Sequence, residues 1–473
     1  MAQTHRFERG GKNEAQRMAH HKKMTETPVE KLIGTLAIPS ILTMMTTSIY
    51  NTADTYFVSQ LGTSASGAVG VCLSLMTLIQ TAGFTLGMGS CNYVAKLLGE
   101  QKDREASEAA STGFFAAIFF GMFVTVMGTI FLPWLMKVMG ATDTILPYAQ
   151  DYARYILFAA PLMGATCMMN SVLRGEGKSK FGMIGMMAGG ILNIILDPIF
   201  IFKLNLGITG AAMATAVSQA VSFCILLSMF LRRKSNVWLG ITYVRDLKVL
   251  WPIIALGSPT MCRQGMNSFA TIALNHAAGP YGDAAIAAMG IVNRLHHLMN
   301  NVVTGMNQGY QPVSGYNYGA RKYGRVRDAT RFIAVSATIL KVIISAIVFV
   351  LAEPIITLFR ADDPAVISFG TTALRLTCLT APLMGMYTAA STSYQSTGRS
   401  LLALSLAFTR QGILYIPMML VLPRFIGALG IQLVTPLTDL ICAIISFPFY
   451  IRFMREMQQL EKETNMQSPK PIV

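Results

Sequence analysis

Long apolar runs separated by short polar links fill most of this chain of 473 residues. A stretch of about 20 mainly apolar residues is long enough to cross a bilayer as a helix, and twelve runs of this length can be delimited in the sequence. They lie near residues 33–58, 65–90, 107–132, 147–173, 180–203, 208–231, 248–275, 284–312, 329–353, 365–395, 400–423 and 428–451. The pattern predicts an all-α membrane protein with twelve transmembrane helices.

The twelve runs are two copies of one unit of six spans. At an offset of 220 residues identical residues meet without a gap, among them Pro39 and Pro259, Gly62 and Gly282, Gly89 and Gly309, and Gly99 and Gly319. At an offset of 221 the segment Ala160–Gly164 (APLMG) recurs as Ala381–Gly385. Because each copy has an even number of spans, both copies enter the membrane in the same sense. The repeat therefore predicts two six-helix lobes related by a pseudo-twofold axis along the membrane normal.

The repeat and the polar segments divide the chain into five parts. We expect a cytosolic N-terminal tail at 1–31, an N-lobe at 32–233, a cytosolic linker at 234–245, a C-lobe at 246–455 and a cytosolic C-terminal tail at 456–473. Parallel repeats of this kind are found in transporters whose two halves rock about a central site. The organisation favours alternating access to the two sides of the membrane.

The charged links set the expected orientation. The formal net charge is +15, although only 13% of the residues are charged. Lys and Arg cluster in the second, fourth, sixth and eighth links, for example in Arg232–Lys234 and Arg321–Arg327. Basic links remain in the cytoplasm, so both termini are expected to be cytoplasmic in a multi-pass protein of the plasma (inner) membrane. The positive charge thus reflects orientation and predicts no binding of nucleic acid.

Two acidic residues lie inside spans of the first copy at similar depths. Asp54 is roughly 6 Å from the outer end of span 1 and Asp197 roughly 9 Å from the outer end of span 5, at about 1.5 Å per residue. Ionisable residues inside a membrane are costly, so their default interpretation is functional. Tyr50 and Asn193 lie one helical turn deeper on the same faces, and Thr215 in span 6 lies at a comparable depth. These five polar groups are expected to form one site that binds both the coupling ion and the substrate.

The second copy offers an internal control on this interpretation. Leu274 corresponds to Asp54, and Ile416 corresponds to Asp197 when Pro198 is aligned with Pro417. The second lobe thus folds without these acids, which favours a functional role for them. The alternative is a neutral, hydrogen-bonded pair of aspartic acids that only holds spans 1 and 5 together.

Pro198 follows Asp197 directly in the segment LNIILDPIF. Proline removes a backbone donor and bends or breaks a helix interior. We therefore expect span 5 to bend at Pro198, beside the titratable group.

The second copy carries polar groups of another kind. Arg263 in span 7 and Asp439 in span 12 are expected to form a structural ion pair, because an unpaired buried charge is strongly unfavourable. Span 8 is unusually polar, and its Asn293, Arg294 and Asn300 are candidates for lining a central cavity.

The chain resembles the prokaryotic multidrug and toxic compound extrusion (MATE) transporters over residues 28–455. The resemblance rests on Tyr50–Val58 (YNTADTYFV), Asn193–Phe200 (NIILDPIF) and Arg410–Gly412 ahead of Pro417. It implies an antiporter whose first lobe binds H⁺ or Na⁺ and responds by bending helix 1. The residues it assigns to this task are Tyr50, Asp54, Asn193, Asp197 and Thr215. Span 7 and span 10, where some members carry an acid, have none here.

The expected function is secondary active efflux of cationic amphipathic drugs or metabolites in exchange for H⁺ or Na⁺. Buried carboxyl groups can titrate 3–5 pH units above the ordinary value of about 3.9, and the 31 Met residues suit walls that repack around varied ligands. The alternative is a lipid-linked oligosaccharide flippase of the same broad fold, which should carry a cavity rich in Arg and Lys. No enzyme activity and no cofactor are expected, no metal is expected unless Na⁺ binds at Asp54, Asn193 and Asp197, and the chain is expected to work as a monomer in the bilayer.

Overall fold

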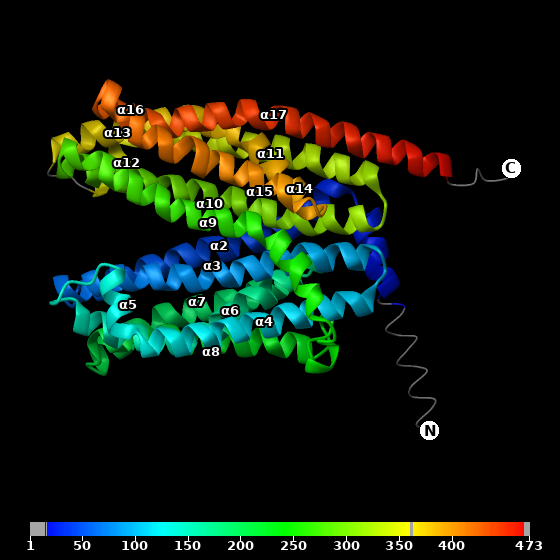
Figure 1. Cartoon of the computed structure of the whole chain (residues 1–473), viewed down its shortest axis with the longest axis horizontal. Coiled ribbons are helices and arrows are strands. Elements are labelled where there is room, and N and C mark those ends of the chain that lie inside the picture. Colours follow the sequence, from blue (N-terminus) through cyan, green and yellow to red (C-terminus); the bar gives the residue numbers. More distant parts are fainter. Residues whose placement is uncertain (1–14, 16, 360–362, 468–473) are drawn as a thin grey trace.

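The computed structural model describes residues 15, 17–359 and 363–467, which form two bundles of long helices lying side by side (Figure 1). The N-lobe consists of α2 (Val29–Ser59), α3 (Thr63–Gly99), α4 (Asp103–Ile130), α6 (Leu146–Gly175), α7 (Ser179–Pro198) with its extension η1 (Ile199–Lys203), and α8 (Gly207–Leu231). The C-lobe consists of α9 (Leu250–Ala278), α10 (Asp283–Gly319), α11 (Tyr323–Val350), α13 (Pro364–Thr380) continued by η5 (Ala381–Leu383) and α14 (Met384–Ser396), α15 (Ser400–Phe408) continued by η6 (Thr409–Tyr415) and α16 (Ile416–Ile426), and α17 (Ala428–Gln467). Short helices occupy some of the links: α5 (Leu132–Val138), η2 (Ile241–Tyr243), η3 (Leu247–Val249), η4 (Gly279–Tyr281) and α12 (Ala352–Phe359).

Two of the long helices are more polar than the others. Within the described residues, ten helices are long and apolar enough to cross a membrane. The remaining two, α9 with 29 residues and α10 with 37, are as long as the other spans but carry more polar side chains. Counting these two, each lobe supplies the six spans that the hydrophobic pattern predicts.

The backbone repeats between the lobes as closely as the sequence does. Gly62 and Gly282, which precede the second helix of each lobe, have φ angles of 114° and 89°. Gln101 and Arg321 follow that helix with φ angles of 60° and 56°, which are uncommon for residues other than glycine. Both pairs are separated by 220 residues. The duplication therefore extends to the conformation of the turns.

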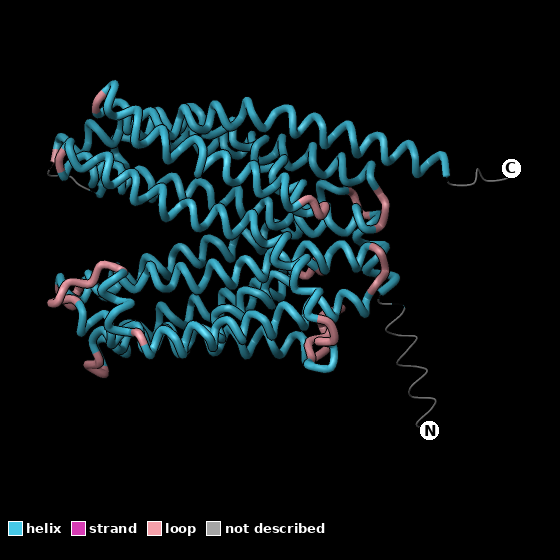
Figure 2. The backbone as a smooth tube through the Cα atoms, viewed as in Figure 1, coloured by secondary structure: helices cyan, strands magenta, loops and turns pink. Residues whose placement is uncertain are grey.

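The lobes pack closely at the end of the molecule where α2 begins and α17 ends (Figure 1), and the loops gather at the two ends of the bundle (Figure 2). A Cβ atom added at Gly99 would lie 2.1 Å from the carbonyl oxygen of Tyr316, and one at Gly319 would lie 2.1 Å from that of Lys96. Only glycine permits such an approach between two helix backbones. The same contact is thus made twice, once from each lobe.

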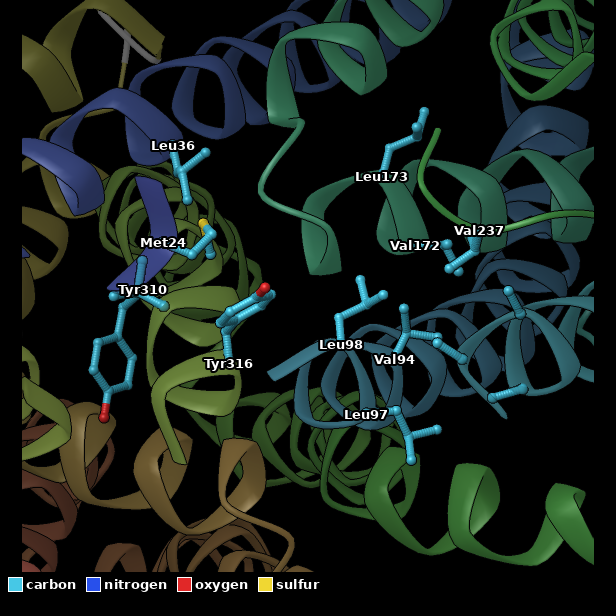
Figure 3. Close-up of a cluster of buried hydrophobic side chains, with 14 of the residues drawn as sticks. Met24, Leu36, Val94, Leu97, Leu98, Val172, Leu173, Val237, Tyr310 and Tyr316 are labelled. Atoms are coloured by element: carbon cyan, nitrogen blue, oxygen red, sulfur yellow. The ribbon is translucent and has the colours of Figure 1, made fainter. Parts of the chain in front are cut away.

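The N-terminal segment 17–27 joins the two lobes at this end. Its residues 17–26 are helical, and Met24 is buried among Leu36, Tyr310 and Tyr316 (Figure 3). Arg17 forms an ion pair with Asp103 of the N-lobe at 2.9 Å. His21 Nδ1 lies 3.0 Å from the hydroxyl oxygen of Tyr316 in the C-lobe.

The predicted tails differ from the structure in extent. The segment 17–27 packs against both lobes, and α2 begins at Val29, three residues before the expected start of the N-lobe. At the other end α17 continues as one helix to Gln467, so the described part of the expected tail 456–473 prolongs the last span. Residues 1–14, 16 and 468–473 of the predicted tails lie outside the described residues.

Candidate functional site

Three helices of the N-lobe bring the predicted polar residues together. Asp54 on α2 is 6% exposed and Asp197 on α7 is fully buried. The Asn193 side chain donates one hydrogen bond to Asp197 Oδ1 at 3.3 Å and another to Thr215 Oγ1 of α8 at 3.3 Å. The i, i+4 spacing of Asn193 and Asp197 places both on one face of α7. Asn193, Asp197 and Thr215 therefore lie at one level, as the depths estimated from the sequence predict.

Tyr50 lies one turn before Asp54 on α2 and packs against α7. Its ring lies against the backbone of α7 at Gly190, where an added Cβ would be 3.2 Å from the ring atom Cδ1. The residue is 9% exposed. A glycine at this position of α7 therefore makes room for the aromatic ring one turn below Asp54.

Tyr152 of α6 is a member of the cluster that the sequence reasoning missed. Its hydroxyl donates to Asp54 Oδ2 at 3.4 Å and the side chain is fully buried. At the offset of 221 that aligns this region, Ala373 is its counterpart in the C-lobe. A tyrosine within a span that has no equivalent in the other copy is the signal that could have identified it.

The cluster has more oxygen acceptors than donors. Among the described residues, Asp54 Oδ1, Asp197 Oδ2 and Asn193 Oδ1 are buried and have no hydrogen-bond partner. Buried polar atoms are nearly always paired, so each exception calls for a physical reason. Three unpaired oxygens, two of them from carboxyl groups, suit a proton or a small hard cation and do not suit an anion.

The helix that carries Asp197 changes its form at Pro198. The α-helical part ends there, and Ile199–Lys203 continue as a π-helix. Short π-helical segments are often found at functional sites. The helix type therefore changes beside the acid, while the bend of span 5 at Pro198 stays a prediction.

The expected ion pair between Arg263 and Asp439 is not the one that the structure contains. Asp439 is fully buried and pairs with Arg410 of η6, with Nη2 at 3.0 Å from Oδ1. The Arg263 side chain donates instead to the hydroxyl of Thr260 at 3.3 Å, one turn earlier on α9. The sequence gives the depth of a residue in the membrane but not the side of the helix on which it lies, and both arginines are at depths that Asp439 could reach.

A separate cavity of about 330 Å³ lies mainly in the C-lobe. The residues that line it come from α2, α3, α9, α10, α11, α14 and η6: Met44, Phe84, Met88, Thr260, Arg263, Gln264, Asn267, His297, Asn300, Asn301, Val303, Thr304, Asn307, Gln308, Gln311, Lys341, Met384, Tyr387, Thr388, Thr392, Arg410 and Gln411. The two polar helices α9 and α10 supply most of the amide groups. Their polarity is thus explained by the cavity that they line.

The predicted lining of the cavity is partly correct. Asn300 faces it and accepts a hydrogen bond from Lys341 Nζ at 2.9 Å. Asn293 and Arg294 are not among the lining residues, and Arg294 is exposed. The sequence reasoning missed Lys341 and Arg410 as lining residues, although an ionisable side chain in an apolar span is the same signal that identified Asp54.

Comparison with known proteins gives matches along most of the chain. The model of the MatE family matches residues 39–199 and 259–421. A protein of Staphylococcus haemolyticus (strain JCSC1435) named "Multidrug export protein MepA" is 25% identical over 439 residues, which cover 92% of this chain and 96% of the relative. A protein of the same name from Staphylococcus aureus (strain MRSA252) is 26% identical over 421 residues, covering 89% of this chain and 93% of the relative.

Solved structures confirm the predicted fold. One described as "Crystal structure of MATE in complex with MaL6" superposes with a TM-score of 0.88 at 24% identity and covers 92% of this chain and 99% of the other. Another, "Crystal structure of MATE in the bent conformation", has a TM-score of 0.87 at 25% identity, with 93% and 99% covered. The twelve-helix, two-lobe architecture expected from the repeat is therefore confirmed.

Proposed function

Since the chain belongs to the MatE family, we propose that it is a secondary active multidrug efflux transporter, which exports small molecules in exchange for H⁺ or Na⁺. The staphylococcal relatives, which are named multidrug export proteins, support the export of drugs. The two lobes alternate between access to either side of the membrane, as parallel repeats in transporters do.

The observation that carries the exchange step is the set of unpaired oxygens in the N-lobe cluster. Asp54 Oδ1, Asp197 Oδ2 and Asn193 Oδ1 have no donor partner among the described residues. One proton on either carboxyl group would supply an O–H donor to this set, and Na⁺ would take the same oxygens as ligands. Either ion would neutralise one of the two buried negative charges and so lower the electrostatic cost of keeping both acids ionised.

Helix α2 connects this cluster to the cavity. Its Met44 lines the cavity, and the side-chain amide of Asn301 donates to Ser48 Oγ at 2.8 Å. Asp54 lies six residues beyond Ser48 on the same helix, which corresponds to roughly 9 Å along its axis. We infer that binding of the ion at Asp54 bends α2 and thereby changes the wall of the cavity, which expels the substrate.

The orientation follows the positive-inside rule. We propose that the N-lobe (32–233) and the C-lobe (246–455) are joined by a cytoplasmic linker at 234–245, with both termini in the cytoplasm and the protein in the plasma (inner) membrane. The close contact of the lobes at the end with the termini then seals the cytoplasmic side. A monomer suffices, because each lobe already has its partner in the chain.

One observation supports the flippase alternative, and another counts against it. Three cations, Arg263, Lys341 and Arg410, line the cavity, as expected for a carrier of pyrophosphate-linked lipids. The cavity of about 330 Å³ is, however, at the small end of the range of roughly 300–1,000 Å³ for sites of drug-sized ligands. A lipid-linked oligosaccharide is much larger than this, so export of small molecules is the better-supported function.

Transport by purified protein in proteoliposomes tests the proposal. The substrates are rhodamine 123 and rhodamine 110, two related dyes, with a pH gradient and a Na⁺ gradient imposed separately. We expect gradient-driven transport of at least one dye, and its loss in Asp54→Asn and in Asp197→Asn. Asp143→Asn, a change in an exposed link of the N-lobe, serves as the matched control and should transport as the wild type does.

The two gradients also identify the coupling ion. Transport that follows the pH gradient alone assigns H⁺, and transport that needs Na⁺ assigns Na⁺. Full transport by both Asp→Asn variants would reject the exchange mechanism. Failure of the wild type to transport either dye under both gradients would count against export itself.

A further inference from the structure

The charges around the C-lobe cavity are not balanced. Arg263, Lys341 and Arg410 line it, and among the described residues that line it there is no Asp or Glu. Asp439, behind the cavity wall, pairs with Arg410. One acid against three cations leaves two positive charges in excess, with histidine counted as neutral. Cations buried in a membrane protein normally pair with acids or line a path for ligands or ions.

Lys341 is the most deeply buried of the three cations. It is 4% exposed and lies on α11, the most apolar of the ten candidate spans. Its Nζ donates to Asn300 Oδ1 at 2.9 Å, and among the described residues no carboxylate lies within ion-pairing distance of it. An ammonium group has three donors. Lys341 therefore has both charge and donors to offer to a ligand.

Arg263 of α9 also lines the cavity and has no partner of opposite charge among the described residues. Its one side-chain hydrogen bond with a described residue goes to Thr260 Oγ1 at 3.3 Å, and none of the ion pairs in the described structure includes it. A guanidinium group has five N–H donors in a fixed planar fork. This geometry matches the two oxygens of a carboxylate or the oxygens of a phosphate or sulfonate.

Another part of the cavity wall is apolar and can contact the apolar part of a ligand. Met44, Phe84 and Met88 of the N-lobe and Met384 of the C-lobe form part of its wall. Methionine side chains adapt to ligands of different shapes. The cavity as a whole thus combines an apolar side with a cationic, amide-rich side.

We propose that the C-lobe cavity binds an anionic group of the exported molecule, a carboxylate or a group of similar charge, between Lys341 and Arg263. The proposal rests on the proposed export function and narrows its substrates to acidic and zwitterionic amphipaths. It differs from the expectation of cationic amphipathic substrates made from the sequence. The acids Asp54 and Asp197 lie in the N-lobe cluster, which we assign to the coupling ion.

Equilibrium binding of two matched dyes to the full-length protein in detergent tests the anion site. Rhodamine 110 carries a free carboxylate, and rhodamine 123 is its methyl ester on the same cationic dye. Fluorescence anisotropy measures both dissociation constants. We expect rhodamine 110 to bind about tenfold more tightly, the effect of one charge-assisted interaction.

Substitutions then show which residues cause the preference for rhodamine 110 over rhodamine 123. Lys341→Gln and Arg263→Gln should each reduce it to about twofold or less, whereas Lys341→Arg keeps the charge and should retain it. Lys137→Gln, in an exposed link of the N-lobe, is the control and should bind both dyes as the wild type does. Because Arg263→Gln and Lys341→Gln lie on different helices, misfolding of one leaves the other as a test.

The outcomes separate this proposal from the export function. No binding of rhodamine 110, equal or tighter binding of the ester, or a preference unchanged in both Gln variants would overturn the anion site. A preserved preference without gradient-driven transport in proteoliposomes would count against export and leave the anion site standing. Transport of both dyes at equal affinity would support export and reject the anion site.

Discussion

The two lobes share one fold but carry opposite charges at the sites built on it. In the N-lobe, Asp54 and Asp197 are buried with unpaired oxygens and with no cation bonded to them among the described residues. In the C-lobe, Lys341, Arg263 and Arg410 line a cavity, and Asp439 forms its ion pair with Arg410. The duplicated helices and turns were therefore kept, while the polar residues inside them diverged. The comparison suggests a division of tasks, with the coupling ion in one lobe and most of the substrate site in the other.

The irregular helices of the two lobes reinforce the comparison. In the N-lobe the π-helical segment Ile199–Lys203 follows Pro198, and in the C-lobe the segment Thr409–Tyr415 precedes Pro417. Both lie in the fifth span of their lobe. The N-lobe segment follows directly on the acid Asp197, and the C-lobe segment contains the cation Arg410. The fifth span of each lobe thus has a π-helical segment at a charged residue, which is an acid in the N-lobe and a cation in the C-lobe.

The same chemical change, Asp to Asn, should destabilise the C-lobe much more than the N-lobe. Asp439→Asn removes the partner of Arg410 and leaves a cation without its counter-ion. Breaking a buried pair in this way costs about 3–5 kcal/mol, and we expect the lower end because Arg410 is 19% exposed. Thermal and denaturant unfolding in detergent, followed by circular dichroism, would measure the loss.

A double variant provides the control for this prediction. Arg410→Met with Asp439→Leu removes both charges and should recover most of the stability, since apolar replacements of a buried pair are often neutral. If Asp439→Asn alone unfolds at the wild-type midpoint, the pair contributes nothing and the structural role of Asp439 is rejected.

The glycine contacts between the lobes are the part of the comparison that should be symmetric. Gly99→Val and Gly319→Val each place side-chain atoms where a backbone carbonyl of the other lobe now lies, 2.1 Å from the new Cβ. Overpacking of this kind typically costs about 1–3 kcal/mol. Because the repeat relates the two positions, we expect similar losses in unfolding measurements. A loss in only one variant would show that the two contacts are not equivalent.

Asp197→Asn in the N-lobe should cost little stability. Asp197 has no cationic partner among the described residues, and an amide supplies a donor to the unpaired oxygens nearby. We expect a change within about 1 kcal/mol of the wild type or a small gain, with gradient-driven transport lost. Compared directly with Asp439→Asn, this variant separates an acid that acts in function from one that holds the fold. A loss as large as that of Asp439→Asn would favour the alternative in which the N-lobe acids only hold spans together.

Much of this organisation could be predicted from the sequence. The remainder could not, because the sequence does not determine how each helix is oriented about its axis. Apolar periodicity and the repeat determine the spans, and the rise per residue gives depth, which is sufficient to bring Asp54, Asn193 and Asp197 to one level. The partner of Asp439 depends on how the helices turn about their axes and pack, which depth does not fix. Arg263 and Arg410 were both available, and packing selected Arg410. Tyr152 differs from the second copy, which marks it as a candidate, but the sequence does not show that its helix turns it towards Asp54.

The smallest effect is expected at the N-terminal segment 17–27, which joins the lobes at the end opposite to the acid cluster. The ring of His20 packs edge-on against Tyr316 of the C-lobe and lies near Gly177 and Lys178 of the N-lobe. Burial lowers the pKa of His20 from 6.5 to about 4, and the positive charges of Lys178, Lys23 and His21 add to this effect. Above pH 6.5 the imidazole is neutral whether the segment is docked or free, so docking does not depend on pH. As pH falls from about 6.5 to about 4, the free segment takes up a proton that the docked segment excludes, and docking weakens.

A spin label on Lys22→Cys, in a background with Cys224→Ser and Cys262→Ser, would report this change as increased mobility at low pH in electron paramagnetic resonance spectra. Lys22 is well exposed, so the label should not disturb the packing. His20→Gln should abolish the pH dependence, because a neutral amide takes up no proton in this range. His21→Gln removes the neighbouring imidazole and its contact with Tyr316 but should preserve the pH dependence. A label whose mobility does not change between pH 7.5 and pH 4, or one that changes equally in His20→Gln, would show that His20 does not control the junction. The contact between the lobes at this end would then depend on the paired glycines, the apolar cluster around Met24 and the polar contacts of Arg17 and His21.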